Sequence, residues 1–120
     1  MKEYPKIHCA KTWMAIACAP GDQEARKRAL RMVVDFDNLG NAMGIEVINI
    51  CLVLGKHCLK AIREHCAIQG GGIRYAYDAE SDCFYLRLRQ GNSVDQRAVD
   101  GSALLNQQGE IVGLEVAWHQ

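Results

Sequence analysis

Three histidine–cysteine dipeptides carry the most reactive side chains of this sequence: His8-Cys9, His57-Cys58 and His65-Cys66. Thiolate and imidazole are the usual zinc ligands, so the repeated pair raises the hypothesis of a metal site. The spacing argues against it, because neighbours on a strand point to opposite faces and residues eight apart on a helix lie about 12 Å apart along the axis. We therefore expect structural thiols, with no metal and no cofactor.

A second spacing is similar to a calcium-binding loop. Asp35, Asp37 and Gly40 stand at its first, third and sixth positions, and Glu46 stands at the twelfth. Position five is Leu39, whose side chain has no ligand oxygen, and no pair of helices is predicted to flank the stretch. A hairpin turn is the better interpretation.

Catalysis by a cysteine nucleophile requires a thiol of lowered pKa beside a base and an orienting group. Six cysteines and four histidines allow many pairings, and the spacing distinguishes none of them. We therefore expect a protein that is not an enzyme.

Five residues form the candidate interaction surface. Tyr85, Arg87 and Arg89 alternate along one predicted strand and give it an aromatic and basic face. Glu46 and Glu115 lie on the outward faces of two other predicted strands, where a glutamate can pair with a cross-strand arginine. Tyrosine and arginine are enriched at protein interfaces and also stack on RNA bases, so an RNA-binding module ranks as a further alternative.

Charge balance favours a protein partner over nucleic acid. Fourteen basic and fourteen acidic side chains give a formal net charge of zero, so the domain has no global field to hold a polyanion. The one basic cluster consists of Arg26, Lys27, Arg28 and Arg31. We expect a protein partner or self-association, and no nucleic acid.

The distribution of apolar residues predicts a cytoplasmic protein without membrane contact. No apolar leader follows Met1, and the longest apolar run, residues 45–54, is interrupted and too short to span a bilayer. In a reducing compartment the six cysteines are free thiols rather than a disulfide framework.

The second half of the chain reads as an antiparallel meander. Residues 73–78 and 83–89 alternate apolar and polar side chains around a turn at 79–82. Further strands are expected over 93–99, 103–106 and 111–118, with a break at Asp100-Gly101. In the first half, 7–19 is expected as one strand, 22–31 as either helix or strand, and 32–36 with 45–50 as a hairpin. Helical spacing of apolar residues over about 52–66 predicts an amphipathic helix.

A repeated pattern relates the two halves. GNAMGIEV (40–47) and GEIVGLEV (109–116) share two glycines, a glutamate and a valine at one offset of 69 residues. A glycine in the turn permits a positive φ angle, and a second glycine four residues later indicates a bulge or a close backbone approach.

Residues 73–116, with the acidic turn 78–82 before the strand FYLRL and the closing G-x-x-x-G-L-E-V, resemble the prokaryotic family called domain of unknown function 2283. Leu104-Leu105-Asn106 departs from its pattern, which has an acidic strand there. Residues 34–37 (VDFD) with 40–47 are similar to the family's second half. The resemblance implies two divergent copies and an antitoxin-like partner of a small toxin.

Together these observations predict an α+β fold: two related antiparallel β-meander units joined by one amphipathic helix. The units are residues 1–50, a degenerate β-unit, and 70–120, with the linking helix at 51–69, in one compact domain. We expect the copies to face one another. The predicted function is a non-enzymatic protein-interaction module. A small-ligand or metal-binding protein, and then an RNA-binding module, stay open as alternatives.

Overall fold

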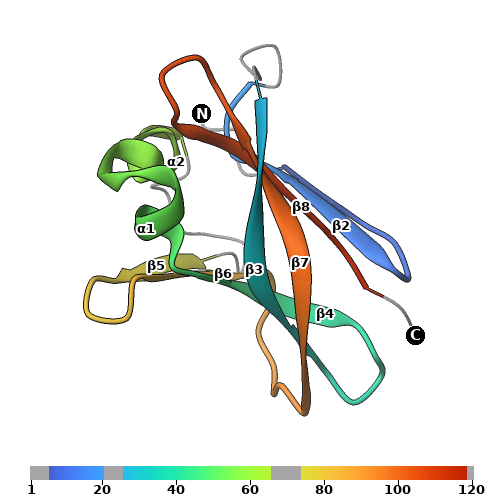
Figure 1. Ribbon diagram of the computed structural model, residues 1–120. Coiled ribbons are helices and arrows are strands. Elements are labelled where there is room, and N and C mark those ends of the chain that lie inside the picture. Colours follow the sequence, from blue (N-terminus) through green and yellow to red (C-terminus); the bar gives the residue numbers. More distant parts are fainter. Residues whose placement is uncertain (1–5, 21–25, 66–73, 119–120) are drawn as a thin grey trace.

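The computed structural model describes residues 6–20, 26–65 and 74–118 (Figure 1). Its eight strands belong to one sheet, and three short helical pieces lie between the fourth and fifth strands. The strands are β1 (Lys6–Cys9), β2 (Trp13–Ala17), β3 (Arg26–Phe36), β4 (Ala42–Ile48), β5 (Arg74–Asp78), β6 (Cys83–Arg87), β7 (Asp95–Leu105) and β8 (Ile111–Ala117). The helical pieces are α1 (Ile50–Leu54), the 3-10 turn η2 (Lys56–Leu59) and α2 (Lys60–His65).

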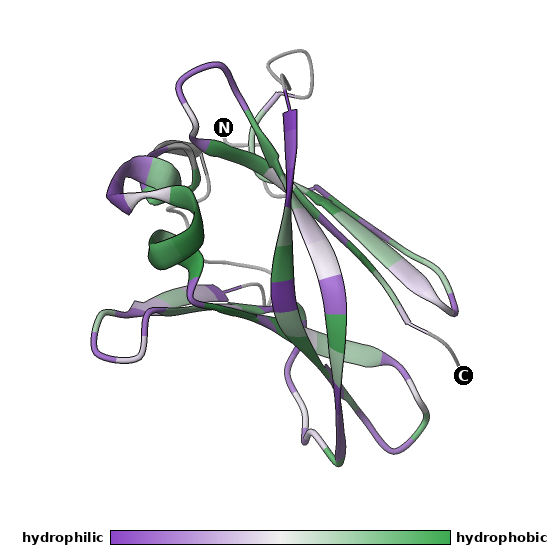
Figure 2. Ribbon diagram, viewed as in Figure 1, coloured by the Kyte–Doolittle hydropathy of each residue, from purple (hydrophilic) through white to green (hydrophobic). Residues whose placement is uncertain are grey.

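The sheet is antiparallel throughout, in the order β1-β2-β8-β7-β3-β4-β6-β5. It curls so that the helical pieces lie against one side (Figure 1). Ile50, Leu59 and Ile62 of these pieces join one core with the inward side chains of the strands. Figure 2 shows hydrophobic residues on α1, a mixture of hydrophobic and hydrophilic residues along the central strands β3 and β7, and hydrophilic residues in most hairpin turns. We call the side of the sheet away from the helices the outer face.

The expected fold class, α+β with two antiparallel β-meander units joined by one amphipathic helix, is wrong. The chain is mostly one sheet, because β6 pairs with β4 rather than with β7, and β2 pairs with β8. The last strand of each half therefore lies between one strand of its own half and one of the other half. Both strands are central in the sheet, and most of their residues are buried.

The expected amphipathic helix is divided into short pieces. Within these pieces, Cys58 and Ile62 are buried, whereas Leu54 is half-buried. Gly55, however, adopts φ 96° and ψ 157°, a conformation open almost exclusively to glycine, and this ends α1 before η2 begins. Gly55 lies within the stretch of helical spacing, yet it is the residue at which the chain changes direction.

Two other strand predictions also change. The stretch 7–19 is a hairpin of β1 and β2 rather than one strand, and the expected break at Asp100-Gly101 lies inside the continuous strand β7. Gly101 does not break the strand; a Cβ there would lie 2.6 Å from Met32 Sδ and 2.8 Å from the Glu115 carbonyl oxygen. The absence of a side chain at Gly101 thus lets the Met32 side chain and the β8 backbone lie close to β7. The ambiguous stretch 22–31 is strand from Arg26 onward, and 22–25 lie outside the described residues.

The central hairpins of the two halves have the same geometry at an interval of 69 residues. Asp35 pairs with Gly44 and Leu104 pairs with Gly113, and a bulge follows in each case. The turns repeat as well, because Gly40 and Gly109 have φ angles of 83° and 80°. The long strands β3 and β7 lie side by side at the middle of the sheet. Common ancestry of the halves stays a prediction.

No helix of the described residues is both long enough and apolar enough to cross a membrane.

Candidate functional site on the outer sheet face

The outer face of β2 and β8 carries one large side chain among small ones. Met14 and Ile16 point into the core, so Trp13 and Ala15 point outward. In the register of the two strands, Trp13 lies opposite Ala117 and Ala15 lies opposite Glu115. Small residues beside an aromatic ring leave space above the strands.

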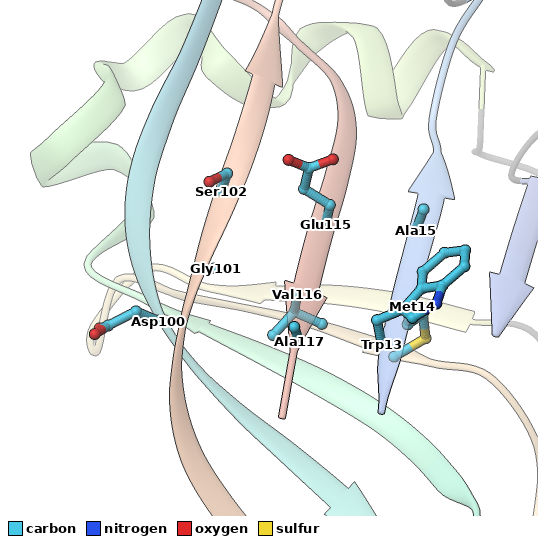
Figure 3. Close-up of a pocket in the computed structure, with 9 residues that line it drawn as sticks. All are labelled: Trp13, Met14, Ala15, Asp100, Gly101, Ser102, Glu115, Val116 and Ala117. Atoms are coloured by element: carbon cyan, nitrogen blue, oxygen red, sulfur yellow. The ribbon is translucent and has the colours of Figure 1, made fainter. Parts of the chain in front are cut away.

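This space is a hollow of about 330 Å³, which we call the Trp13 hollow (Figure 3). Trp13 forms one wall with 45% of its surface exposed, and the Glu115 and Ser102 side chains rise from neighbouring strands. The lining residues are Trp13, Met14, Ala15, Asp100, Gly101, Ser102, Glu115, Val116 and Ala117.

The polar part of the Trp13 hollow is acidic. The nine lining residues include two carboxylates, Asp100 and Glu115, and no basic side chain. Glu115 Oε1 accepts a hydrogen bond from Lys27 Nζ at 2.9 Å, and Asp100 Oδ1 lies 3.7 Å from Arg31 Nη1. All four side chains are substantially exposed, so these ion pairs are weak and a competing cation can replace them.

In the other half, a tyrosine stands at the position that corresponds to Ala15. Tyr85 lies opposite Glu46 as Ala15 lies opposite Glu115, and the two glutamates are one 69-residue interval apart. The Tyr85 ring passes over Gly44, where a Cβ would lie 2.7 Å from the tyrosine hydroxyl. A glycine is therefore required beneath the ring.

Tyr85 ends in a hydrogen-bonded cluster around Asp35. The Tyr85 hydroxyl donates to Asp35 Oδ2 at 2.9 Å, and Gln96 Nε2 donates to Oδ1 at 2.8 Å. Asp35 is only 8% exposed. Burial of the phenol, together with its hydrogen bond to the carboxylate, raises the pKa of Tyr85. The cluster provides these polar groups with hydrogen-bond partners, which is a structural role.

The structure brings part of the predicted surface together. Tyr85 and Glu46 are direct neighbours, and Arg87 lies two residues along the same strand. Arg89 follows the end of β6 and is exposed, and its carbonyl oxygen accepts a hydrogen bond from Arg87 Nε at 3.0 Å. Glu115 lies in the other half, at the Trp13 hollow.

Trp13 is the functional candidate that the sequence reasoning missed. Trp13 lies within the stretch 7–19, whose expected single strand assigns it no face. Trp13, Met14, Ala15 and Ile16 are all apolar, so their alternation separates two faces of the strand without indicating which one is exposed.

The histidine–cysteine dipeptides lie on separate elements: His8-Cys9 belong to β1, opposite Ala15 and Met14 of β2, and His57-Cys58 belong to η2. Among residues 6–20, 26–65 and 74–118, no group of three or more histidine, cysteine, aspartate or glutamate side chains could hold a metal ion. His57 Nε2 lies 2.8 Å from the Gln108 carbonyl oxygen, and Cys66 is outside the described residues.

The calcium-like spacing forms a hairpin turn, as expected. Asp37 Oδ1 accepts hydrogen bonds from the backbone N–H groups of Leu39 and Asn41. The bond from Asn41 is the largest influence, and these bonds outweigh desolvation and lower the pKa of Asp37. The carboxylate is thus used to close the turn.

The chain matches no protein-family model, no curated protein and no solved structure.

Proposed function

We propose that this protein is a non-enzymatic protein-interaction module that binds a basic side chain of a partner protein in the Trp13 hollow. The observation that carries the proposal is one hollow lined by an exposed tryptophan, by two carboxylates on adjacent strands and by several small residues.

The size of the Trp13 hollow favours one inserted side chain. Pockets for small molecules commonly measure about 300–1,000 Å³ and enclose most of the ligand. At about 330 Å³, the hollow is at the lower limit of this range, and it is open to solvent. An arginine or lysine side chain presented by a larger surface fits this shape, because the partner itself supplies the missing cover.

The chemistry of the walls favours a cation. An indole ring attracts ammonium and guanidinium groups, and arginine in particular stacks flat on tryptophan. Glu115 lies on a neighbouring strand, where its carboxylate can accept hydrogen bonds from the guanidinium N–H groups. Lys27 Nζ donates a hydrogen bond to the Glu115 carboxylate in this structure, so it would compete with the incoming cation.

The resemblance to domain of unknown function 2283 supports the same class of function. It implies an antitoxin-like protein that binds a small toxin, and a partner surface rich in basic residues would suit the acidic hollow. Self-association through the edge strands β1 and β5 is the further mode of interaction that we propose.

A peptide pair tests the proposal directly. We would titrate the protein with acetyl-Gly-Arg-Gly-amide and with its citrulline analogue, which has the same shape without the charge, and follow the two indole N–H signals by NMR. Trp118 is buried and its Nε1 donates to the Lys11 carbonyl oxygen at 2.9 Å, so it is an internal reference. We expect the arginine peptide to shift the Trp13 signal with a Kd of about 1 mM.

Three variants sharpen this test. Trp13→Ala and Glu115→Gln should each weaken binding of the arginine peptide, while Lys27→Met should strengthen it by removing the competing ammonium group. Equal binding of the citrulline peptide, or a Trp13 signal that stays unchanged at saturating arginine peptide, would refute the proposed cation site.

A further inference from the structure

A second hollow, on the helical side of the molecule, contains two neighbouring thiols. It measures about 690 Å³, and we call it the Cys51 cleft. Cys51 Sγ lies 3.8 Å from Cys58 Sγ. Cys51 is partly exposed in the cleft, whereas Cys58 is fully buried behind it. The lining residues are Cys51, Leu52, Lys56, Leu59, Arg63, Tyr77, Ala79 and Asp82.

The chain reversal at Gly55 creates this thiol pair. On a continuous helix, residues seven apart lie about 10 Å apart along the axis. Here the Gly55 N–H donates to the Cys51 carbonyl oxygen at 2.8 Å, and the Cys58 N–H donates to the Gly55 carbonyl oxygen at 3.2 Å. The two turns fold η2 back onto α1 and place the sulfur atoms side by side.

Asp82 fixes the position of Cys51. Its carboxylate accepts hydrogen bonds from the backbone N–H groups of Cys51 and Leu52, at 3.0 and 2.9 Å, and from the Tyr77 hydroxyl at 2.8 Å. Asp82 itself has a left-handed backbone, with φ 55°. The first thiol is thus held by the β5–β6 turn as well as by its own helix.

We propose that Cys51 and Cys58 form a reversible disulfide by exchange with a low-molecular-weight disulfide that enters the Cys51 cleft. This redox site is separate from the Trp13 hollow, and it does not depend on the proposed interaction function. Lys56 and Arg63 line the cleft, so it favours an anionic reagent such as glutathione disulfide.

The exchange proceeds in two steps. Cys51 releases its proton to water, and its thiolate attacks one sulfur of the reagent, which breaks the reagent's S–S bond and expels one thiolate that is protonated by water. Cys58 then loses its proton and attacks the Cys51 sulfur, which expels the second thiol. Two cysteine thiols are oxidised to one disulfide, and one reagent disulfide is reduced to two thiols.

The burial of the two thiols determines their order. Desolvation, and then the neighbouring Cys51, raise the pKa of the Cys58 thiol to about 12. Cys58 is therefore a poor first nucleophile, and it reacts once the adjacent Cys51 sulfur carries the leaving group. Cys51 is the thiol that a reagent in the cleft meets first.

The test is equilibration of the reduced protein in glutathione redox buffers, followed by acid quenching, alkylation and tryptic peptide mapping. Lys56 separates the two cysteines, so a link between them joins two different peptides. We expect a stoichiometric Cys51–Cys58 link that dithiothreitol removes. Cys58→Ala should instead accumulate glutathione on Cys51, and Cys51→Ser should leave Cys58 unmodified.

Exposed Cys9 provides the internal comparison. Glutathione on Cys9 while Cys51 and Cys58 both stay reduced would overturn the proposal, as would a Cys51 link to any cysteine other than Cys58. Gly55→Ala, which opposes the chain reversal, should slow formation of the link while leaving glutathionylation of Cys9 unchanged.

Discussion

The outer face of the sheet is closed over β4 and β6 and open over β8 and β2, although the two strand pairs lie at equivalent positions. In the closed region, Tyr85 spans Gly44 and donates to the buried Asp35. In the open region, Ala15 replaces the tyrosine and Leu104 replaces the aspartate. One backbone arrangement therefore supports a hydrogen-bonded cluster on one side and a hollow on the other.

The difference shows that the strand pairing and the binding surface are determined by separate residues. Glycines and alternating apolar side chains set the pairing in both regions. A few outward side chains then decide whether the surface is filled. Exchanging those side chains should exchange the properties of the two regions.

The largest effect is expected from filling the open region. Ala15→Tyr introduces a large ring among the small residues that line the Trp13 hollow and should abolish binding of the arginine peptide. Ala98→Tyr, the same substitution on an exposed outer position of β7 outside the Trp13 hollow, is the matched control and should leave binding unchanged. Retained binding by the folded Ala15→Tyr protein would show that the peptide binds elsewhere.

The glycines beneath the two regions should differ in their tolerance of a side chain. A Cβ at Gly44 would lie 2.7 Å from the Tyr85 hydroxyl and 3.0 Å from the Leu86 carbonyl oxygen, whereas the closest approaches at Gly113 are 3.0 Å. Gly44→Ala should lower the free energy of unfolding by about 2–3 kcal/mol and Gly113→Ala by about 1 kcal/mol. Urea denaturation measures both, and equal losses would contradict the comparison.

The Asp35 cluster should be transferable to the equivalent positions of the other half, Leu104 and Ala15. Asp35→Leu leaves the Tyr85 hydroxyl and the Gln96 amide without their acceptor and should cost about 1–3 kcal/mol of unfolding free energy. Leu104→Asp alone should also destabilise, because Leu104 packs against Ala19 and Val112. The double variant Ala15→Tyr/Leu104→Asp should lose about 1 kcal/mol less unfolding free energy than the sum of the two single losses. A double-mutant cycle measures this difference.

The smallest effect is expected in the two hairpin turns, where Asp37 and Asn106 accept equivalent backbone hydrogen bonds. The pKa of Asp37 is lower in the folded state than its usual 3.8. Its contribution to stability is therefore complete above pH 3.8 and is lost as the pH falls through the lowered value. Asp37→Asn should make acid unfolding slightly less steep below pH 4, by circular dichroism. An unchanged acid limb would mean that the turn opens before Asp37 titrates.

Local structure was predictable from the sequence where the alternation of side chains is strong. The turn at 79–82, most of β6 and the β3–β4 hairpin follow from period-two patterns and from turn residues. Strand pairing was not predictable in this way, because alternating strands such as β6 can pair with several partners. Isolated glycines were not predictable either: Gly101 permits a close approach instead of the expected break, and Gly55 interrupts the expected helix.

Of the candidate surface, Tyr85, Arg87 and Glu46 share outward positions on paired strands, and their role in binding stays a prediction. The hollow at Trp13 depends on the absence of a large side chain at Ala15. A missing side chain gives no signal in a single sequence.

The exchange of terminal strands between the halves has a consequence for biosynthesis. On the ribosome β2 emerges early, but one of its two neighbours, β8, is complete only when residue 117 has been made. Until then the first half exposes the strand edges of β2 and β4 and the apolar inner face of β4. Pairings so distant in sequence form slowly. The newly made chain should therefore depend on chaperones until its last strand is released, and translation that stops before β8 should give an aggregating product rather than a smaller working domain.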